Sequence, residues 1–187
     1  MRAAATIICI TGFREGPADA TGLGRIWLGA RKHSSPETWV TKFRWNADWK
    51  AEARDIARNL AEDAKVVVCA YSWGAGFGFI QLAKHLRNEG VKVTAACLCD
   101  PVYRSRWLVF RWLALVRLPR IKLPFGVGLV RWVRQRVNRP AGHDLVAREG
   151  TVLETAQELN LGHGESDESR ALREMCERTM QEDVEDD

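Results

Sequence analysis

The stretch that most constrains the fold runs from Val66 to Ile80 and reads VVVCAYSWGAGFGFI. Its β-branched apolar run stops at a small residue, Ala70, and Ser72 follows two positions later. A glycine-rich turn then leads into a helical pattern. A strand, a sharp turn and a helix in this order place Ser72 at the apex of the turn, with its hydroxyl at the end of a sheet. The rest of the chain must supply what a serine needs to become a nucleophile.

Strand-like and helix-like segments alternate along the 187 residues. The segments expected to form strands are 6–10, 38–45, 65–70, 91–98 and, with a poorer pattern, 151–161. The segments expected to form helices are 20–30, 49–62, 75–88 and 166–182. Such alternation predicts one α/β domain over 1–187, with a mainly parallel sheet of about five strands covered on both faces. Ligands bind at the carboxyl ends of the strands in such sheets.

Three residues that follow predicted strands form a candidate catalytic set. A serine nucleophile needs a base to remove its proton, and the base needs a carboxylate to orient it. Asp100 directly follows the strand after Ser72, and His163 follows the last strand-like segment. Among the carboxylates between Ser72 and His163, Asp100 is the one directly after a predicted strand. His143 is the alternative base, but it follows no predicted strand.

The segment Ala70-Tyr71-Ser72-Trp73-Gly74, the pair Asp100-Pro101 and His163 followed by Asp167 make the chain resemble the α/β-hydrolase superfamily, particularly its small lipase, esterase and cutinase-like members. The resemblance implies a three-layer fold and a Ser-His-Asp triad that cleaves a carboxylic ester or thioester through an acyl-enzyme. Three features depart from the family pattern. Ala70 replaces the first glycine of G-x-S-x-G, no HGGG segment follows the first strand, and the acid comes one strand earlier than in most relatives.

The turn at Ser72 also predicts an oxyanion hole. A strained serine turn requires small neighbours, and Ala70 and Gly74 meet that requirement. The peptide N–H after the serine, from Trp73, is one expected oxyanion donor, and the N–H of Phe13, after the first strand, is the other. We expect no metal and no organic cofactor. The structural alternative for Ser72 is a loop serine that caps the following helix.

A dinucleotide-binding unit is a different interpretation of the same stretch. A strand, a glycine-rich turn, a helix and an acidic residue further on are its outline. The glycines of this chain read G-x-G-x-G from Gly74 to Gly78, where the fingerprint requires G-x-G-x-x-G. Phe79 takes the place of the third glycine, and Trp73 would crowd a pyrophosphate. We therefore keep this function as the less favoured one.

A basic, apolar segment follows Asp100. Between residues 101 and 139 there are ten basic residues and no acidic one, whereas ten acidic residues follow from Glu165 to the end. We expect a helical cap insertion over 101–145 that contacts an apolar, lipid-like ester or an anionic membrane surface. Alternatively, the two charged segments attract each other. No nucleic-acid-binding module is recognised. The competing function is a catalytically idle hydrolase-fold protein that binds a membrane or partner through 101–139.

The cysteines and the apolar runs indicate the compartment. Five cysteines, an odd number, lie mostly in strand-like runs, which favours free buried thiols in a reducing compartment over disulfides. Cys97 and Cys99 have no further ligands at zinc-site spacing, so we interpret them as core residues. No apolar run reaches the ~20 residues of a membrane span, and the first run lacks a cleavage site. We therefore expect a cytoplasmic protein.

Overall fold

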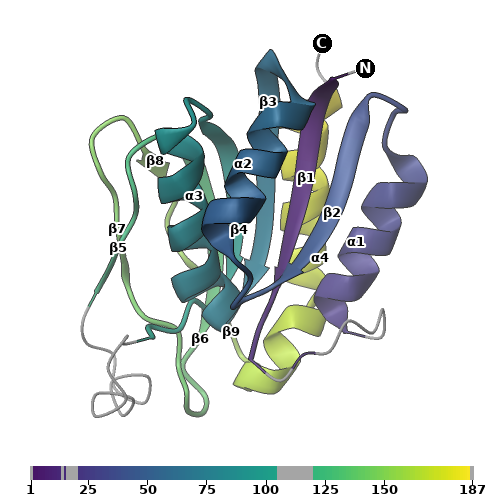
Figure 1. Cartoon of the computed structure of the whole chain (residues 1–187). Helices are drawn as coiled ribbons and strands as arrows, with labels where there is room; N and C mark the ends of the chain where they lie inside the picture. Colours follow the sequence, from purple (N-terminus) through teal and green to yellow (C-terminus); the bar gives the residue numbers. More distant parts are fainter. Residues whose placement is uncertain (1, 14, 16–20, 105–119, 186–187) are drawn as a thin grey trace.

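A parallel sheet covered by helices on both faces forms the centre of the protein (Figure 1). The structure is a computed structural model, which describes residues 2–13, 15, 21–104 and 120–185. The five longest strands are, in order across the sheet, β2 (Thr38–Arg44), β1 (Ala3–Thr11), β3 (Leu60–Tyr71), β4 (Val93–Cys99) and β6 (Val127–Gln135). All of their pairings are parallel, which confirms the expected three-layer α/β fold.

Shorter strands extend the sheet beyond the expected five. β8 (Val152–Leu153) and β9 (Gln157–Leu159) both pair with β6 in parallel, so the main sheet has seven strands. β5 (Ile121–Lys122) and β7 (Leu145–Val146) form a separate two-stranded sheet. Strands of two or three residues are too short to show a hydrophobic period. The pattern over 151–161 therefore indicated one poor strand instead of two.

The central strands β1, β3 and β4 are buried on both faces. The segments that pair across them, Ile7–Ile10, Val66–Tyr71 and Ala95–Cys99, are buried throughout. A parallel strand with helices on both sides reads as a continuous apolar run, which explains why the sequence pattern identified these strands. Because they are parallel, their carboxyl ends meet at one edge of the sheet.

Two helices cover each face of this sheet (Figure 1). On one face lie α2 (Trp49–Asn59) and α3 (Phe79–Asn88), and on the other lie α1 (Gly22–His33) and α4 (Arg170–Met180). Side chains cap three of these helices by accepting from backbone N–H groups of the first turn: Thr21 from Gly24, Asp48 from Ala51 and Ser169 from Leu172. None of the helices in the described ranges has the length and apolar character that crossing a membrane requires.

The two faces of the sheet have different cores. Large side chains such as Ile56, Phe79 and Leu86 fill the face under α2 and α3. The face under α1 and α4 contains the five cysteines, all buried and free: Cys9, Cys69, Cys97, Cys99 and Cys176. Burial raises the pKa of the Cys97 and Cys99 thiols well above their ordinary value. These thiols are therefore neutral components of the core at neutral pH.

One boundary of the second helix differs from the sequence expectation. The helix expected over 49–62 ends at Asn59, and β3 begins at Leu60. Ala3 of β1 pairs with Leu60, and a register shift separates this pair from the next one along β1. Pairing with β1 thus extends the strand into a polar stretch that favours a helix by itself.

The expected C-terminal helix over 166–182 is divided into three parts. A 3₁₀ turn spans His163–Glu168, α4 follows, and a π-helical turn spans Gln181–Glu185. The division lies at Ser169, whose backbone is extended and whose side chain caps α4. A capping serine favours a helix start at this position over a continuous helix.

The segment 101–145, expected to be a cap insertion, also contributes β6 to the structure. β6 belongs to the main sheet, where it pairs with β4 through contacts such as Arg131 opposite Cys97. Arg131 is only 8% exposed, and its guanidinium forms ion pairs with Glu154 and Glu182 that offset the cost of burying its charge. The ion pair with Glu182 links β6 to the acidic C-terminal segment. Residues 105–119, which hold the apolar and basic run of the expected cap, lie outside the described residues.

Candidate active site

Ser72 lies at a strained turn directly after β3. Its φ angle is 55°, in the left-handed region that non-glycine residues rarely adopt. The backbone around it is held by three hydrogen bonds. Its N–H donates to the carbonyl of Cys99 at 2.9 Å, and its own carbonyl accepts from Gly76 at 2.8 Å and from Val102 at 3.1 Å. The end of β4, the segment after it and the following helical turn therefore hold a turn conformation that the local sequence would not adopt alone.

The glycines after Ser72 are required by close backbone packing. A Cβ atom at Gly74 would lie 2.4 Å from the carbonyl oxygen of Ile10, and one at Gly76 would lie 2.0 Å from that of Val102. The first turn of the helix, a π-helical turn over Gly74–Gly78, thus fits between the end of β1 and the segment that follows β4. These glycines accommodate the protein's own backbone, so they give no support to a phosphate-binding loop.

Asp100 occupies a second strained turn, directly after β4, with a φ angle of 43°. Its side chain is completely buried. Oδ1 accepts from the backbone N–H groups of Gln135 at 3.0 Å and Gly142 at 2.7 Å. Oδ2 accepts from the side-chain amide of Gln135 at 3.1 Å and lies 2.5 Å from Nδ1 of His163. Three hydrogen bonds from Gln135 and Gly142 thus hold the carboxylate toward the imidazole.

His163 connects this carboxylate to the serine. Its Nε2 lies 2.9 Å from Oγ of Ser72, so the structure brings Ser72, His163 and Asp100 into one hydrogen-bonded chain. With Nδ1–H donating to Asp100, Nε2 is the acceptor for the serine hydroxyl; this tautomer is assigned from the hydrogen-bond pattern. The backbone of His163 is also fixed. Its N–H donates to Oδ1 of Asn138 at 2.8 Å, and its carbonyl accepts from the Tyr71 hydroxyl at 2.5 Å.

His143, the alternative base, has a different place. Its side chain is completely buried, and its Nδ1 accepts from the backbone N–H of Tyr103 at 3.2 Å. The backbone N–H of His143 donates to the carbonyl of Pro101 at 2.7 Å. His143 thus packs against the loop after β4, whereas His163 contacts Ser72.

The two residues expected to form the oxyanion hole both lie beside Ser72. Trp73 is the next residue in the turn, and Phe13 follows Gly12 after β1. A Cβ atom at Gly12 would lie only 3.1 Å from Cβ of Ser72, so this loop approaches the serine closely. The Phe13 and Trp73 rings contact each other, with centroids 4.4 Å apart.

An aromatic wall extends from these two residues along the carboxyl edge of the sheet. It consists of Phe13, Trp45, Trp73 and Phe77, with Trp45 centred 4.9 Å from Trp73 and 6.2 Å from Phe77. The Arg104 guanidinium lies over it, 4.6 Å from the Trp45 ring centre and 4.9 Å from that of Phe77. Phe13 remains 49% exposed. An apolar surface with one cation is therefore available next to Ser72.

Glu15 and Asp167 form a pair of acids beside the loop after β1, and the sequence does not predict this pair. The Glu15 carboxyl accepts from the N–H of Gly12 and hydrogen-bonds to Asp167, and Asp167 accepts from the N–H of Gly22 at 3.1 Å. Desolvation, with a further contribution from Asp167, raises the pKa of Glu15 to about 8. The pair therefore holds a proton at neutral pH and links the loop after β1 to the turn that carries His163.

The supporting residues were missed for a common reason. Gln135 and Gly142 contact Asp100 across 35 and 42 positions of sequence, and Tyr71 contacts His163 across 92. One weak signal existed: Gln135 is a polar residue at the end of an apolar strand, the position that also marks Asp100. The sequence around Gly142 and Tyr71 gives no comparable signal.

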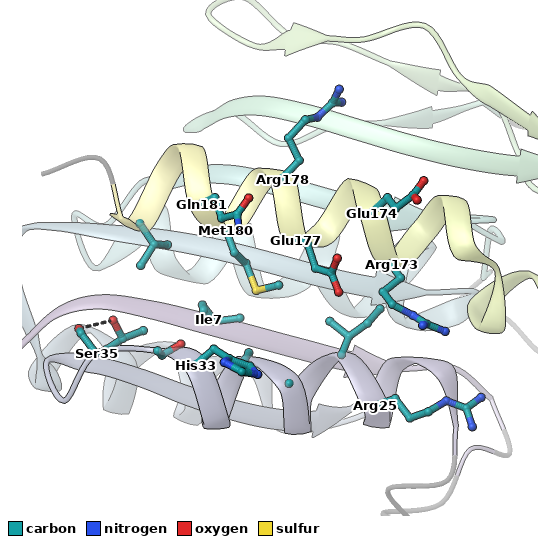
Figure 2. A pocket seen from close by; sticks show the side chains of 16 residues that line it. Ile7, Arg25, His33, Ser35, Arg173, Glu174, Glu177, Arg178, Met180 and Gln181 are labelled. Carbon is teal, nitrogen blue, oxygen red and sulfur yellow. Dashed lines mark hydrogen bonds between the residues drawn. The ribbon is translucent and has the colours of Figure 1, made fainter.

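A cavity of about 890 Å³ lies elsewhere, between α1 and α4 (Figure 2). Ile7 of β1 lies at its floor, and Met180 of α4 points into it. His33 and charged side chains of both signs line it; the charged ones are Arg25, Arg173, Glu174, Glu177 and Arg178. Neither Ser72 nor His163 lines it. This cavity is therefore separate from the candidate active site.

No protein-family model matches the sequence, and no curated protein matches it significantly. Solved structures do match. A metagenome-derived lipolytic enzyme, from a study of LipS and LipT, aligns with 96% of this chain and 93% of its own at 10% identity, with a TM-score of 0.56. A protein from Xanthomonas campestris pv. campestris, assigned to the α/β superfamily of hydrolases, aligns over 94% of this chain and 99% of its own at 18% identity and a TM-score of 0.50. The chain therefore has the α/β-hydrolase fold.

Proposed function

We propose that the protein is a serine hydrolase that cleaves carboxylic esters or thioesters. The observation that supports this function is the hydrogen-bonded chain from Oγ of Ser72 through His163 to the buried Asp100. A serine needs a base within hydrogen-bond distance, and the base needs an orienting acid. A serine that only capped the following helix would need neither of these partners.

The mechanism follows from the positions of these groups. Oγ of Ser72 attacks the carbonyl carbon of the substrate while Nε2 of His163 takes its proton. The Asp100 carboxylate stabilises the imidazolium, and the N–H groups of Trp73 and Phe13 donate to the oxyanion. His163 then gives the proton to the leaving alcohol or thiol, which departs from the acyl-enzyme. A water molecule, deprotonated by His163, attacks the acyl-enzyme and releases the acid and free Ser72.

The aromatic wall supports a substrate with a substantial apolar part. Phe13 and Trp73 lie at its end nearest the serine, and Trp45 and Phe77 continue it. Each methylene buried against such a surface contributes roughly 0.8 kcal/mol to binding. The lipolytic activity named for one of the structurally similar proteins agrees with this substrate class. We therefore favour an acyl ester of the esterase or lipase type.

A fluorophosphonate probe tests the nucleophile directly, because it reacts covalently with an activated serine. We expect the wild type to be labelled at Ser72 and to hydrolyse p-nitrophenyl esters, and Ser72→Ala to lose both properties. Ser35→Ala, a change at an exposed serine, is the matched control and should retain both. Absence of labelling in the wild type, or equal labelling of Ser72→Ala, would instead favour an idle hydrolase-fold protein that acts by binding.

A further inference from the structure

Three of the five buried cysteines converge on one point under α4. The sulfur atoms of Cys69, Cys97 and Cys176 all lie within 4.8 Å of one another. Cys69 and Cys97 are register partners on β3 and β4, so their side chains lie side by side on one face of the sheet. Cys176 approaches them from α4, and all three residues are completely buried.

We propose that Cys69, Cys97 and Cys176 form a binding site for a single soft, thiophilic metal ion of the Cu(I) class. We call these three residues the thiol triad. This site is separate from the candidate active site and does not depend on the proposed hydrolase function.

The geometry of the thiol triad suits a three-coordinate ion. With a metal–sulfur distance of about 2.3 Å, three sulfurs arranged in a plane around an ion are about 4 Å apart. The separations in the structure are at most 4.8 Å, so shifts of less than about 1 Å per sulfur complete the site. The sulfurs come from two strands and a helix packed on them, and these elements already hold the thiols in place.

The ligand set selects the class of ion. Zn²⁺ in structural sites takes four ligands, whereas the thiol triad supplies three sulfurs in a buried layer. Thiolate sulfur is a soft ligand and prefers soft ions such as Cu(I). Each thiol that becomes a ligand releases its proton to solvent when the ion binds, and the ion replaces the proton on sulfur.

The surroundings limit the charge that the site can hold. Arg131 lies opposite Cys97 on β6, and its guanidinium donates to Oγ1 of Thr179 at 2.8 Å. The Thr179 hydroxyl in turn donates to the carbonyl of Met175 at 2.8 Å, which also accepts from the Cys97 thiol at 3.7 Å. Arg131 also forms ion pairs with Glu154 and Glu182, so only part of its positive charge is available to thiolates. Three thiolates around a monovalent ion carry a net charge of about −2, and the remaining charge of Arg131 offsets part of it.

Two further cysteines provide matched controls. Cys9 is the register partner of Cys69 on β1, and Cys99 lies two residues after Cys97, so both belong to the same buried layer. Their sulfur atoms are not in the cluster. If buried thiols in this layer bound metal without a defined site, Cys9 and Cys99 would matter as much as the thiol triad.

Anaerobic titration of the reduced protein with Cu(I), against the chelator bicinchoninate, tests the proposal. We expect the wild type, Cys9→Ala and Cys99→Ala to retain one Cu(I) per chain, with a higher melting temperature than the copper-free protein. Cys69→Ala and Cys176→Ala should lose this copper. The X-ray absorption spectrum of the wild-type complex should contain only sulfur ligands in the first shell.

Three results would overturn the site. They are failure of the wild type to retain copper against the chelator, equal loss of copper in Cys9→Ala and Cys176→Ala, and nitrogen or oxygen as the main ligands in the absorption spectrum. Near-UV circular dichroism of the copper-free variants establishes that they are folded. If Cys176→Ala does not fold, Cys69→Ala and the ligand spectrum of the wild type still decide the question.

Discussion

The side-chain amide of Gln135 donates to Oδ2 of Asp100 at 3.1 Å, the same oxygen that lies 2.5 Å from Nδ1 of His163. The Gln135 backbone N–H donates to the other oxygen, Oδ1, at 3.0 Å. One residue at the end of β6 therefore fixes both oxygens of the carboxylate and, through them, the imidazole. Gln135 is completely buried, so water does not replace these contacts easily.

Gln135→Met should impair the proposed catalysis through Asp100. Methionine cannot donate to Oδ2 of Asp100, so the carboxylate and the His163 imidazole are held less firmly. We therefore expect kcat to fall about tenfold, the equivalent of about 1.4 kcal/mol, with little change in KM. Loss of this buried amide should also lower the free energy of unfolding by about 1–3 kcal/mol.

The value of kcat per folded molecule separates this role from a structural one. A residue that only supported the turn after β6 would lower the folded fraction and leave kcat per folded molecule unchanged. Gln157→Met, at an exposed glutamine on β9, is the matched change and should alter neither kcat nor the stability.

Gly142→Ala should displace the Asp100 carboxylate. A Cβ atom at Gly142 would lie 2.3 Å from Oδ1 of Asp100, the oxygen that accepts from the Gly142 N–H at 2.7 Å. Because a misplacement of about 1 Å can cost 100-fold in rate, we expect kcat/KM to fall by about 10- to 100-fold. Gly29→Ala in α1, where a Cβ meets no atom within 4 Å, should retain full activity. Equal activities of the two variants would contradict the close contact at Asp100.

One physical reason explains why the layout of the fold can be predicted from the sequence, together with the positions of Ser72, Asp100 and His163. Parallel strands buried on both faces are continuous apolar runs, so their ends are visible in the sequence, and polar residues at those ends meet at one edge of the sheet. The resemblance to α/β-hydrolases then suggested their order. The catalytic roles themselves remain predictions for the experiments proposed above.

What the sequence could not show are contacts between distant residues. Residues 127–137 are an apolar run that contains arginines, and such a run after Asp100 resembles a cap insertion more than a strand of the main sheet. Arg131 and Arg134 form ion pairs with acids that follow them by ten or more positions, and no local pattern indicates such partners. Gln135 and Asp100 are likewise far apart in the sequence, and so are Cys176 and the two strands that carry Cys69 and Cys97. No local pattern predicts these contacts either.

Tyr71→Phe should slow the reaction moderately by loosening His163. The Tyr71 hydroxyl donates to the carbonyl of His163 at 2.5 Å, and its ring stacks on the imidazole with centroids 5.1 Å apart. Phenylalanine retains the stacking and loses a hydrogen bond worth about 0.5–1.5 kcal/mol. We expect kcat to fall about 3- to 10-fold with little change in KM. Steady-state kinetics check this, with Tyr103→Phe as the control; a kcat as high as that of the wild type would contradict it.

Glu15 should make stability depend on pH. Its pKa is raised from 4.5 to about 8 in the folded protein, chiefly by desolvation. A carboxyl with a raised folded-state pKa contributes stability that is complete below its unfolded pKa and is lost as the pH rises through its folded pKa. We therefore expect the free energy of unfolding of the wild type to fall between about pH 4.5 and pH 8 and then to level off.

Glu15→Gln tests this pH dependence. Glutamine can still accept from Gly12 and donate to Asp167, but it does not ionise. The variant should therefore show a flatter profile in urea unfolding at several pH values across this range. Glu62→Gln, at an exposed position of β3, should follow the wild type. A decline in Glu15→Gln as steep as that of the wild type would show that another group is responsible.

Trp45→Leu should change the selectivity for acyl chains. Trp45 is only 9% exposed and contacts Phe13, Trp73 and Phe77, so it forms the middle of the aromatic wall. If the acyl chain packs on this wall, loss of the indole should weaken the binding of long chains more than that of short ones. We expect the ratio of kcat/KM for octanoyl over acetyl p-nitrophenyl ester to fall about tenfold, the equivalent of about 1.4 kcal/mol.

The ratio is the appropriate measurement because both esters are tested on one preparation. A smaller folded fraction in Trp45→Leu lowers both rates equally and cancels. Trp39→Leu on β2, a partly buried tryptophan outside the aromatic wall, should leave the ratio unchanged. Equal ratios in Trp45→Leu and Trp39→Leu would mean that the acyl chain binds elsewhere, and a preference of the wild type for the acetyl ester would contradict an apolar acyl site next to Ser72.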